Sequence, residues 1–334
     1  MSRVTCAIAA GLLALTTFSP TPSKAEGTIR IAEQYGISFL PLYVIRDQKL
    51  IEKHGKDLGV DVAVDWAKFG GGSAVNDALL SGSVDIAAAG VGPVLTIWDR
   101  THGNADVKGI AALGSLPSFL VTNNEAVKSL KDFTKADKIA LPAVSVSVQA
   151  RTLQIAAEKE FGVGSHKKLD DITVSLAHPD AVAALTSGST EITAHFATPP
   201  FQYQELQNPK IHRVLSSYDV LGGPATSNIV YATSKFREDN PKTYKAFFEA
   251  LKEAVAWINA HKQEAADTYI RVEKSKLDPA LIRQIVEDKD VQFKLTPERT
   301  SVYADFLART GQIKNKPASW KDYFFDDIQT VEGS

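Results

Sequence analysis

Cysteine is almost absent from this sequence of 334 residues, in which Cys6 is the only one. Cys6 also lies in an N-terminal segment that we expect to be removed. A chain without further cysteine forms no internal disulfide, no thiolate zinc site and no cysteine nucleophile. The functional classes built on these groups are therefore excluded.

Two other chemical patterns are missing. None of the seven histidines stands three or four residues from another, as a helical zinc pair requires. Gly72-Ser73-Ala74 lacks the framing glycines of a Gly-x-Ser-x-Gly nucleophile elbow. We therefore expect no metal, no cofactor and no enzymatic activity.

Long apolar runs are also scarce, and the one that we single out covers residues 6–15, behind Arg3. It is too short for a membrane span, which needs about 20 residues. Ser23-Lys24-Ala25 places small residues at the two positions that signal peptidase reads. The alternative, an N-terminal helix buried in the fold, conflicts with two prolines at positions 20 and 22. We expect residues 1–25 to be a cleaved signal peptide and the mature protein to be periplasmic.

No excess of positive charge is present. Removing the leader takes Arg3 and Lys24 from the 37 basic residues, which leaves 35 against 39 acidic ones, a formal charge of −4. A nucleic-acid-binding protein normally carries a basic stripe, so we expect no nucleic-acid partner.

What the sequence does contain is an alternation of strands and helices. β-type runs at residues 28–32, 60–66 and 84–89 are separated by helical patterns at 40–54 and 75–80, and a strand at 138–141 precedes a helix at 145–160. This alternation predicts an α/β fold with parallel sheets covered by helices on both faces.

One segment of the chain is echoed. Residues 78–86 (ALLSGSVDI) return 106 positions later as residues 184–192 (ALTSGSTEI). Helix-turn-strand units resemble one another in general, but the surrounding order of elements repeats as well. We therefore expect two related Rossmann-like lobes, lobe I from 27–118 and 219–334, and lobe II from 119–218.

Two extended segments flank the second copy of the echo, at residues 119–122 and 228–232. We expect them to be the paired crossover strands, or hinge, between the lobes. From Pro241 onward the apolar residues recur at three- and four-residue steps, which predicts helices that support lobe I.

The order of these features resembles the nitrate, sulfonate and taurine family of transporter solute-binding proteins (NMT1/THI5-like). The resemblance is carried by Leu40-Pro41-Leu42, the turn at 69–73, the echoed motif at 78–85, the Gly90 to Pro93 loop, and the C-terminal segments at 254–258, 264–266, 311–313 and 320–322. It implies the type II periplasmic binding protein fold, two lobes that close over a small molecule. It also implies delivery to an ABC permease and its ATPase, and we expect a monomer.

Ligands of open α/β sheets bind beyond the carboxyl ends of the strands. In lobe I, three strand-end loops qualify, and their candidate residues are Gln34, Tyr35, Gly71, Gly72, Ser73, Gly90, Val91 and Gly92. Glycines at a helix N-terminus let the backbone approach an anion. Each of these candidates also has a structural alternative. Ser73 could cap its own helix, Tyr35 could pack in the core, and the loop from Gly90 could be a simple turn.

In lobe II the candidates lie at a helix start and after the echoed strand: Ser145, Ser147, Gln149, His195 and Phe196. Phe119 and Tyr231, on the crossover segments, are candidate cleft walls. A lone histidine is as often structural, and aromatic residues also fill cores. No arginine lies securely on a strand-end loop, so a neutral or aromatic ligand stays open beside a sulfonate, taurine or nitrate. A ligand-sensing partner of a membrane receptor and a thiamine-pyrimidine-precursor binding protein also remain open.

Overall fold

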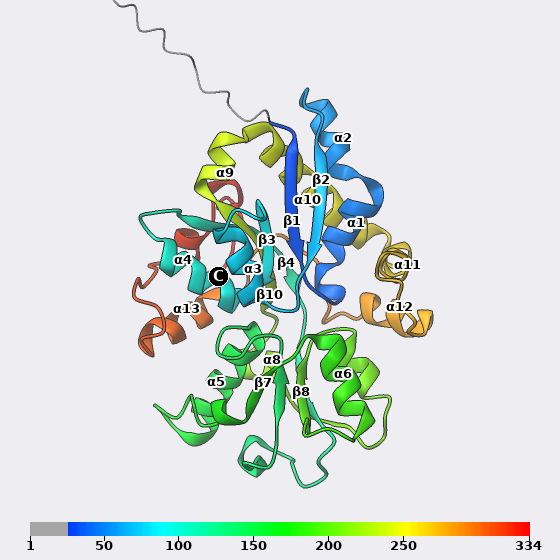
Figure 1. Cartoon of the computed structure of the whole chain (residues 1–334), viewed down its shortest axis with the longest axis vertical. Coiled ribbons are helices and arrows are strands. Elements are labelled where there is room, and N and C mark those ends of the chain that lie inside the picture. The colour runs from blue at the N-terminus through cyan, green and yellow to red at the C-terminus, as the bar shows by residue number, and fades with distance from the viewer. Residues whose placement is uncertain (1–25) are drawn as a thin grey trace, which may run out of the picture.

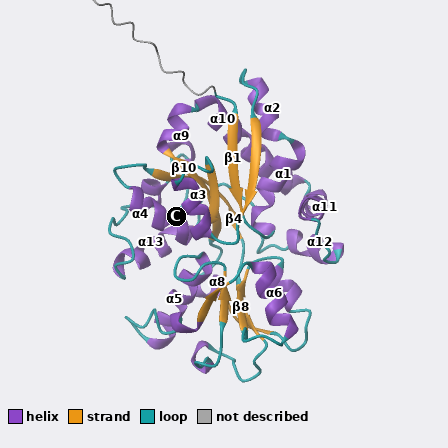
Figure 2. Cartoon of the chain, in the orientation of Figure 1, coloured by secondary structure: helices purple, strands orange, loops and turns teal. Residues whose placement is uncertain are grey.

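The computed structural model describes residues 26–334, and the expected signal peptide at 1–25 lies outside the described residues. Two bodies are joined by a narrow connection, an upper one that contains both chain ends of the described part and a lower one formed by the middle of the chain (Figure 1). Each body holds one five-stranded sheet with helices around it (Figure 2). We call the upper body lobe I and the lower body lobe II.

The lobe I sheet has the strand order β2-β1-β3-β10-β4. Its strands are β1 (Thr28–Glu33), β2 (Ala63–Lys68), β3 (Ile86–Gly90), β4 (Val107–Ser115) and β10 (Thr226–Thr233). β1, β2 and β3 are parallel, whereas β10 runs antiparallel to both β3 and β4. Every residue of β3 is buried, in keeping with a strand that is covered on both faces.

The lobe II sheet has the order β7-β6-β8-β5-β9. Its strands are β5 (Phe119–Thr122), β6 (Ile139–Leu141), β7 (Thr173–Ser175), β8 (Ala194–Ala197) and β9 (His212–Ser216). β6, β7 and β8 are parallel, and β5 is antiparallel to β8 and β9. Position by position this is the arrangement of lobe I, so the two lobes share one topology.

The crossovers differ from the expectation in one respect. Residues 119–122 and 228–232 do not pair with each other, because β5 lies inside the lobe II sheet and β10 inside the lobe I sheet. Each is the single antiparallel strand of its sheet, since the chain enters that sheet from the other lobe. The expected all-parallel sheets are mixed for the same reason.

The helices largely follow the expected positions. They are α1 (Leu40–Gln48), α2 (Leu50–Asp57), α3 (Gly72–Leu80), α4 (Val91–Thr101), α5 (Val148–Phe161), α6 (His178–Ser187), α7 (Phe201–Glu205), α8 (Ser217–Leu221), α9 (Ser234–Asp239), α10 (Pro241–Ala260), α11 (Lys262–Glu273), α12 (Pro279–Glu287) and α13 (Thr300–Arg309). The single helix expected at 40–54 is two, because Lys49 adopts a left-handed conformation (φ 53°, ψ 44°) that ends α1.

The echoed segments have the same local structure. Gly82 and Gly188 both adopt left-handed φ values, 69° and 62°, just after α3 and α6, a conformation that glycine tolerates best. Ser81 Oγ donates to the carbonyl of Ala78 at 3.0 Å, and Ser187 Oγ donates to that of Ala184 at 2.9 Å. The repeated residues therefore form the same type of turn in both lobes. It ends a helix and precedes β3 in lobe I and β8 in lobe II.

The C-terminal helices support lobe I, as expected. Pro241 is the first residue of α10, whose buried face packs against α1 and α2. Within residues 26–334, no helix combines the length and the apolar composition that crossing a membrane demands. In the same part of the chain, no group of three or more His, Cys, Asp or Glu side chains could hold a metal ion.

Candidate functional site

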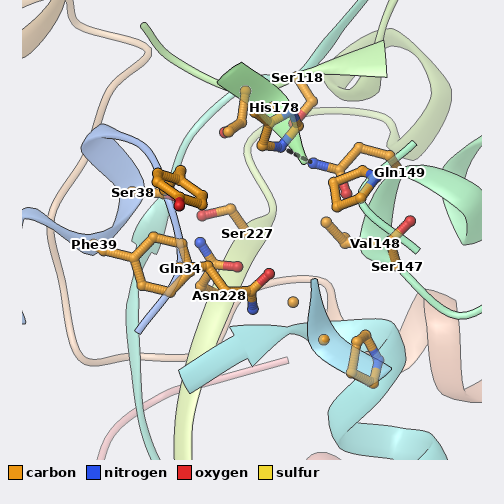
Figure 3. Close-up of a pocket in the computed structure, with 16 residues that line it drawn as sticks. Gln34, Ser38, Phe39, Ser118, Ser147, Val148, Gln149, His178, Ser227 and Asn228 are labelled. Carbon is orange, nitrogen blue, oxygen red and sulfur yellow. Dashed lines mark hydrogen bonds between the residues drawn. The ribbon is translucent and has the colours of Figure 1, made fainter. Parts of the chain in front are cut away.

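A small cavity lies between the two lobes, at the level where their sheets face each other (Figure 3). It has a volume of about 30 Å³. The residues that line it are Gln34, Tyr35, Ser38, Phe39, Gly72, Gly90, Pro93, Ser118, Pro142, Ser147, Val148, Gln149, His178, Thr198, Ser227 and Asn228. Both lobes and both crossover regions contribute, so the cavity exists only where the lobes meet.

Helix N-termini converge on the cavity. Gly72 begins α3 and Gly90 precedes α4 in lobe I, while Ser147 precedes α5 and His178 begins α6 in lobe II. Ser147 caps α5 by accepting a hydrogen bond from the Ala150 amide at 3.1 Å. The first amides of a helix have no partner within it and carry the positive end of its dipole. Four such ends give the cavity a positive potential without a cationic side chain.

The cavity wall combines apolar side chains, such as Phe39 and Val148, with polar side chains that carry no charge. Within the described part of the chain, none of the lining residues is Lys, Arg, Asp or Glu. Gln34 Nε2 donates to the Ala88 carbonyl at 3.1 Å, which leaves the amide oxygen of Gln34 free to accept. The Ser38 hydroxyl is buried and has no hydrogen-bond partner among the described residues, so a ligand that pairs with it would remove a desolvation cost.

His178 belongs to a buried hydrogen-bonded row. Its Nδ1 lies 2.8 Å from His195 Nε2, and His195 Nδ1 lies 2.7 Å from Glu205 Oε1. On the cavity side, His178 Nε2 lies 3.4 Å from the Gln149 amide (Figure 3). Burial raises the pKa of Glu205 to about 9 and lowers the pKa of His195 to about 3. It also lowers the pKa of His178 well below its usual range, with the neighbouring His195 adding to the effect. Burial therefore favours the neutral form of each of the three groups.

The lobes touch each other around the cavity. The Ile37 amide of lobe I donates to the Pro199 carbonyl of lobe II at 2.8 Å. An ideal Cβ at Gly71 would lie 2.2 Å from the Pro142 carbonyl oxygen, and one at Gly90 would lie 2.8 Å from Val148 Cβ. These distances describe a closed arrangement in which glycine backbone of lobe I is pressed against lobe II.

Six of the residues expected at a ligand site line the cavity. They are Gln34, Tyr35, Gly72, Gly90, Ser147 and Gln149. All six lie at the end of a strand or at the start of a helix, at the facing edges of the two sheets, where the rule for open α/β sheets places ligands.

Two other candidates form the contact between the lobes instead, and a third is buried beside them. Gly71 abuts Pro142, and a Cβ at Gly92 would lie 2.3 Å from the Val146 carbonyl oxygen. Val91, between Gly90 and Gly92, is fully buried. These residues border the cavity region without lining it.

Two serines point elsewhere. Ser73 is exposed on α3 and does not line the cavity. Its alternative role as a helix cap is wrong as well, because Gly71 is the N-cap residue and no side chain caps α3. Ser145 is exposed and has a left-handed φ of 63°, so it shapes the turn before α5.

The aromatic candidates and His195 lie behind the wall. Phe119 packs against the Tyr203 ring in a tilted arrangement, with centroids 5.7 Å apart. Phe196 and His195 are fully buried in lobe II. Tyr231 is fully buried in lobe I, where its hydroxyl donates to Asn76 Oδ1 at 2.6 Å. The core-filling alternative therefore fits Tyr231, and His195 reaches the cavity only through His178.

Sequence reasoning missed ten lining residues, among them Ser38, His178 and Asn228. The rule that ligands bind beyond strand ends also applies to His178, because His178 begins a helix soon after β7. β7 has only three residues, which is too short for the sequence pattern to predict a strand, and the loop after it therefore carries no strand-end signal. Ser38 and Asn228 carry no local signal, since only the packing of the lobes turns them toward the cavity.

Comparison with known proteins places this geometry in a family. The model of the NMT1-like family matches residues 37–272, which cover most of both lobes. No curated protein shows significant sequence similarity to the chain.

Solved structures share the architecture. The alkanesulfonate-binding protein SsuA from Xanthomonas axonopodis pv. citri, bound to MOPS, superposes with a TM-score of 0.70 at 16% identity, covering 87% of this chain and 96% of its own. The periplasmic nitrate-binding protein NrtA from Synechocystis PCC 6803 gives 0.70 at 16% identity, with 92% and 86% covered. A Candida albicans protein described as having the generic periplasmic binding protein fold gives 0.66 at 17% identity, with 87% and 92% covered.

The expected α/β architecture is thereby confirmed: this chain belongs to the NMT1-like family and has the fold of the periplasmic binding proteins.

Proposed function

We propose that this protein is the solute-binding component of an ABC importer, which captures a small molecule between its lobes and delivers it to a membrane permease. One observation carries the proposal: a single cavity is built from strand ends and helix starts of both lobes, so that a ligand there bridges them. Ligand-dependent closure then gives the permease a signal that the site is filled.

The ligand class follows from the cavity wall. Four helix N-termini and several neutral polar groups surround a space without charged side chains among the described residues. This environment favours a small molecule with acceptor oxygens, such as a sulfonate, taurine or nitrate. The alkanesulfonate- and nitrate-binding structural neighbours support this choice.

The ligand must enter through an opened form. Contacts between the lobes surround the cavity, among them the hydrogen bond from the Ile37 amide to the Pro199 carbonyl and the approach of Gly71 to Pro142. A solute therefore enters when these contacts separate and is held when they form again.

The same proposal assigns the remaining properties of the protein. Residues 1–25 direct export to the periplasm and are removed, and lobe II spans 119–218 between the two parts of lobe I, 27–118 and 219–334. The protein acts as a monomer and performs no chemistry on its ligand. Its binding residues are those of the cavity wall, with Gln34, Tyr35, Ser147, Gln149 and His178 as polar contacts.

A ligand screen on the purified mature protein tests the proposal. Native mass spectrometry identifies any ligand that is retained through purification. Thermal shift is then measured with sulfonates, taurine, nitrate, aromatic carboxylates and pyrimidines. A ligand at 100 times its Kd should add about 2.7 kcal/mol to the free energy of unfolding.

The control is the same screen on a Gln149→Ala, His178→Ala double variant, which should lose the shift while remaining folded. If no member of the panel stabilises the wild-type protein and none is retained, the acceptor-oxygen ligand class is wrong. An equal shift in the double variant would place the site elsewhere.

A further inference from the structure

A hydrogen-bonded row of three titratable side chains lies behind the cavity, and its contacts fix where its protons lie. It runs from His178 on α6 through His195 on β8 to Glu205 on α7, with internal distances of 2.8 and 2.7 Å. All three residues are at most 6% exposed. Each of the two short contacts joins a pair of atoms that both carry a lone pair when deprotonated, so each needs one proton between them.

A third proton makes the row neutral. With only the two shared protons, the row carries a full negative charge in a buried site, which is costly without a cation nearby. The other titratable side chains of these elements do not compensate that charge. Asp180 on α6 is acidic and exposed, and Tyr203 on α7 packs against Phe119. Arg151 on the adjacent α5 donates to Gln154 and Gln312 instead.

Only two positions at the ends of the row can hold the third proton. One is Glu205 Oε2, which is buried and has no hydrogen-bond partner among the described residues, so a hydroxyl there would be an unsatisfied donor. The other is His178 Nε2, which faces Gln149 and the cavity. A proton at the second position can be accepted by the Gln149 amide oxygen once the amide is turned, or by a ligand in the cavity, whereas a proton at the first position meets no acceptor.

We propose that Glu205 and His195 are positioning residues that hold His178 in the Nε2–H form, so that lobe II presents a neutral N–H donor to the ligand. The inference rests on the proposed binding function and narrows its ligand class: the group that contacts lobe II is an acceptor oxygen and not an ammonium. The result is the same whether the proton nearest Glu205 sits on the carboxyl group or on His195, because both neutral arrangements place a proton on His178 Nε2.

Gln149 fits this assignment. Its Nε2 is the atom that lies 3.4 Å from His178 Nε2 in this structure, but the oxygen and nitrogen of an amide are assigned from their partners. With a donor on His178, the Gln149 amide turns its oxygen toward the imidazole. The pKa of Glu205, raised by burial to about 9, agrees with a row that keeps its third proton at neutral pH.

Histidine NMR on the full mature protein tests the inference without any ligand. In protein labelled with ¹⁵N-histidine, we expect His178 at pH 7 to show the Nε2–H tautomer. Above about pH 9 the row should lose one proton, and His178 should change to the Nδ1–H tautomer because Glu205 then only accepts. Glu205→Gln, which stays neutral and can still donate to His195, should keep the Nε2–H form across the same pH range.

Two outcomes would overturn the inference. One is an Nδ1–H tautomer or a charged imidazole at His178 at pH 7. The other is a His178 tautomer that stays the same in the wild-type protein at alkaline pH, as it is expected to do in Glu205→Gln. A histidine with a merely structural role would show no difference between the two proteins.

A second measurement connects the tautomer to ligand choice. Nitrate and methanesulfonate should shift the His178 Nε2 resonance, whereas methylammonium at the same concentration should not; a shift by methylammonium alone contradicts the inference. If no probe binds while the tautomer responds as described, the proposed ligand class fails and the positioning of His178 stands.

Discussion

Tyr231 lies on a crossover strand, where the sequence predicts a ligand contact, but its buried hydroxyl has a structural role. Its hydroxyl donates to Asn76 Oδ1 at 2.6 Å, and Asn76 Nδ2 donates to the Pro93 carbonyl at 3.0 Å. The two bonds connect β10 to α3 and α4 in the core of lobe I. Tyr231 therefore holds the cavity wall from behind rather than touching a ligand.

Tyr231→Phe is expected to destabilise the protein without changing ligand affinity. The substitution leaves Asn76 Oδ1 buried without its donor, which costs about 1–3 kcal/mol in the free energy of unfolding. Chemical denaturation monitored by circular dichroism measures the loss. Tyr35→Phe is the matched control, because no hydrogen bond of the Tyr35 hydroxyl occurs among the described residues; its stability should stay within about 0.5 kcal/mol of wild type. Equal stability of Tyr231→Phe and wild type would contradict the structural role.

Glu205→Gln should stabilise the protein at neutral and alkaline pH. The unfolded chain ionises this carboxyl near pH 4.5, whereas the folded protein holds the proton up to a pKa of about 9. Folding therefore becomes less favourable as pH rises between these values, by up to about 1.4 kcal/mol per pH unit. Gln removes this dependence, so the stability difference between variant and wild type should grow with pH.

Denaturant titrations at pH 5, 7 and 8.5 measure that difference. Glu191→Gln, at an exposed glutamate, is the control and should show no comparable trend. A stability difference that stays constant between pH 5 and 8.5 would mean that the folded Glu205–His195 pair does not retain the extra proton, and would contradict the prediction.

At the scale of elements, the acidic residue of the echoed motif has different roles in the two lobes. Asp85 accepts from Arg30 Nε at 2.9 Å, from Arg30 Nη2 at 2.6 Å and from the Arg30 amide at 2.9 Å. It therefore ties the start of β3 to β1. The equivalent residue in lobe II, Glu191, is exposed.

Asp85→Asn should lower the free energy of unfolding by about 1–2 kcal/mol. The substitution removes the charge from hydrogen bonds that are individually worth about 1.5–3 kcal/mol, and the partial exposure of Arg30 reduces the loss. Glu191→Gln at the echoed position should change stability by less than about 0.5 kcal/mol. Thermal unfolding of both variants checks the difference, and similar losses would show that the acid has one common role.

At the scale of the whole molecule, closure depends on glycine at the contact between the lobes. Gly71 has an extended backbone (φ −170°), which any residue adopts. An alanine Cβ there would lie 2.2 Å from the Pro142 carbonyl oxygen of lobe II. Only the closed arrangement excludes the side chain, because the clash lies entirely between the lobes.

Gly71→Ala should therefore weaken ligand binding while leaving the fold intact. Relieving a clash of this kind costs typically 1–3 kcal/mol, which corresponds to roughly a 5- to 150-fold higher Kd. X-ray scattering should show a smaller radius of gyration when wild type is saturated with a ligand from the screen, and less compaction for the variant.

Gly70→Ala is the matched control, since its Cβ would meet only Ala177 Cβ at 3.4 Å, an ordinary contact distance. It should close and bind like wild type. If saturation leaves the radius of wild type unchanged, or if Gly71→Ala compacts fully, closure at this contact is not part of binding.

The sequence by itself determined the local and repeated features of this protein. The echo at 78–86 and 184–192 predicted two related lobes, and its glycines and serines form the same turn in both because turn geometry depends on neighbouring residues. The rule that ligands bind at strand-end loops correctly predicted six lining residues, because the carboxyl ends of parallel strands always meet at one edge of the sheet. The resemblance to a family of binding proteins came from the order of such local motifs.

Tertiary structure alone decided which side chains meet. His178 faces the cavity and His195 lies behind it, although both follow or end lobe II strands. Gly71 and Gly92 touch the opposite lobe, and Tyr231 bonds to a residue 155 positions away. These placements depend on how two sheets pack across a gap, and short-range patterns carry no information about contacts between residues so distant along the chain.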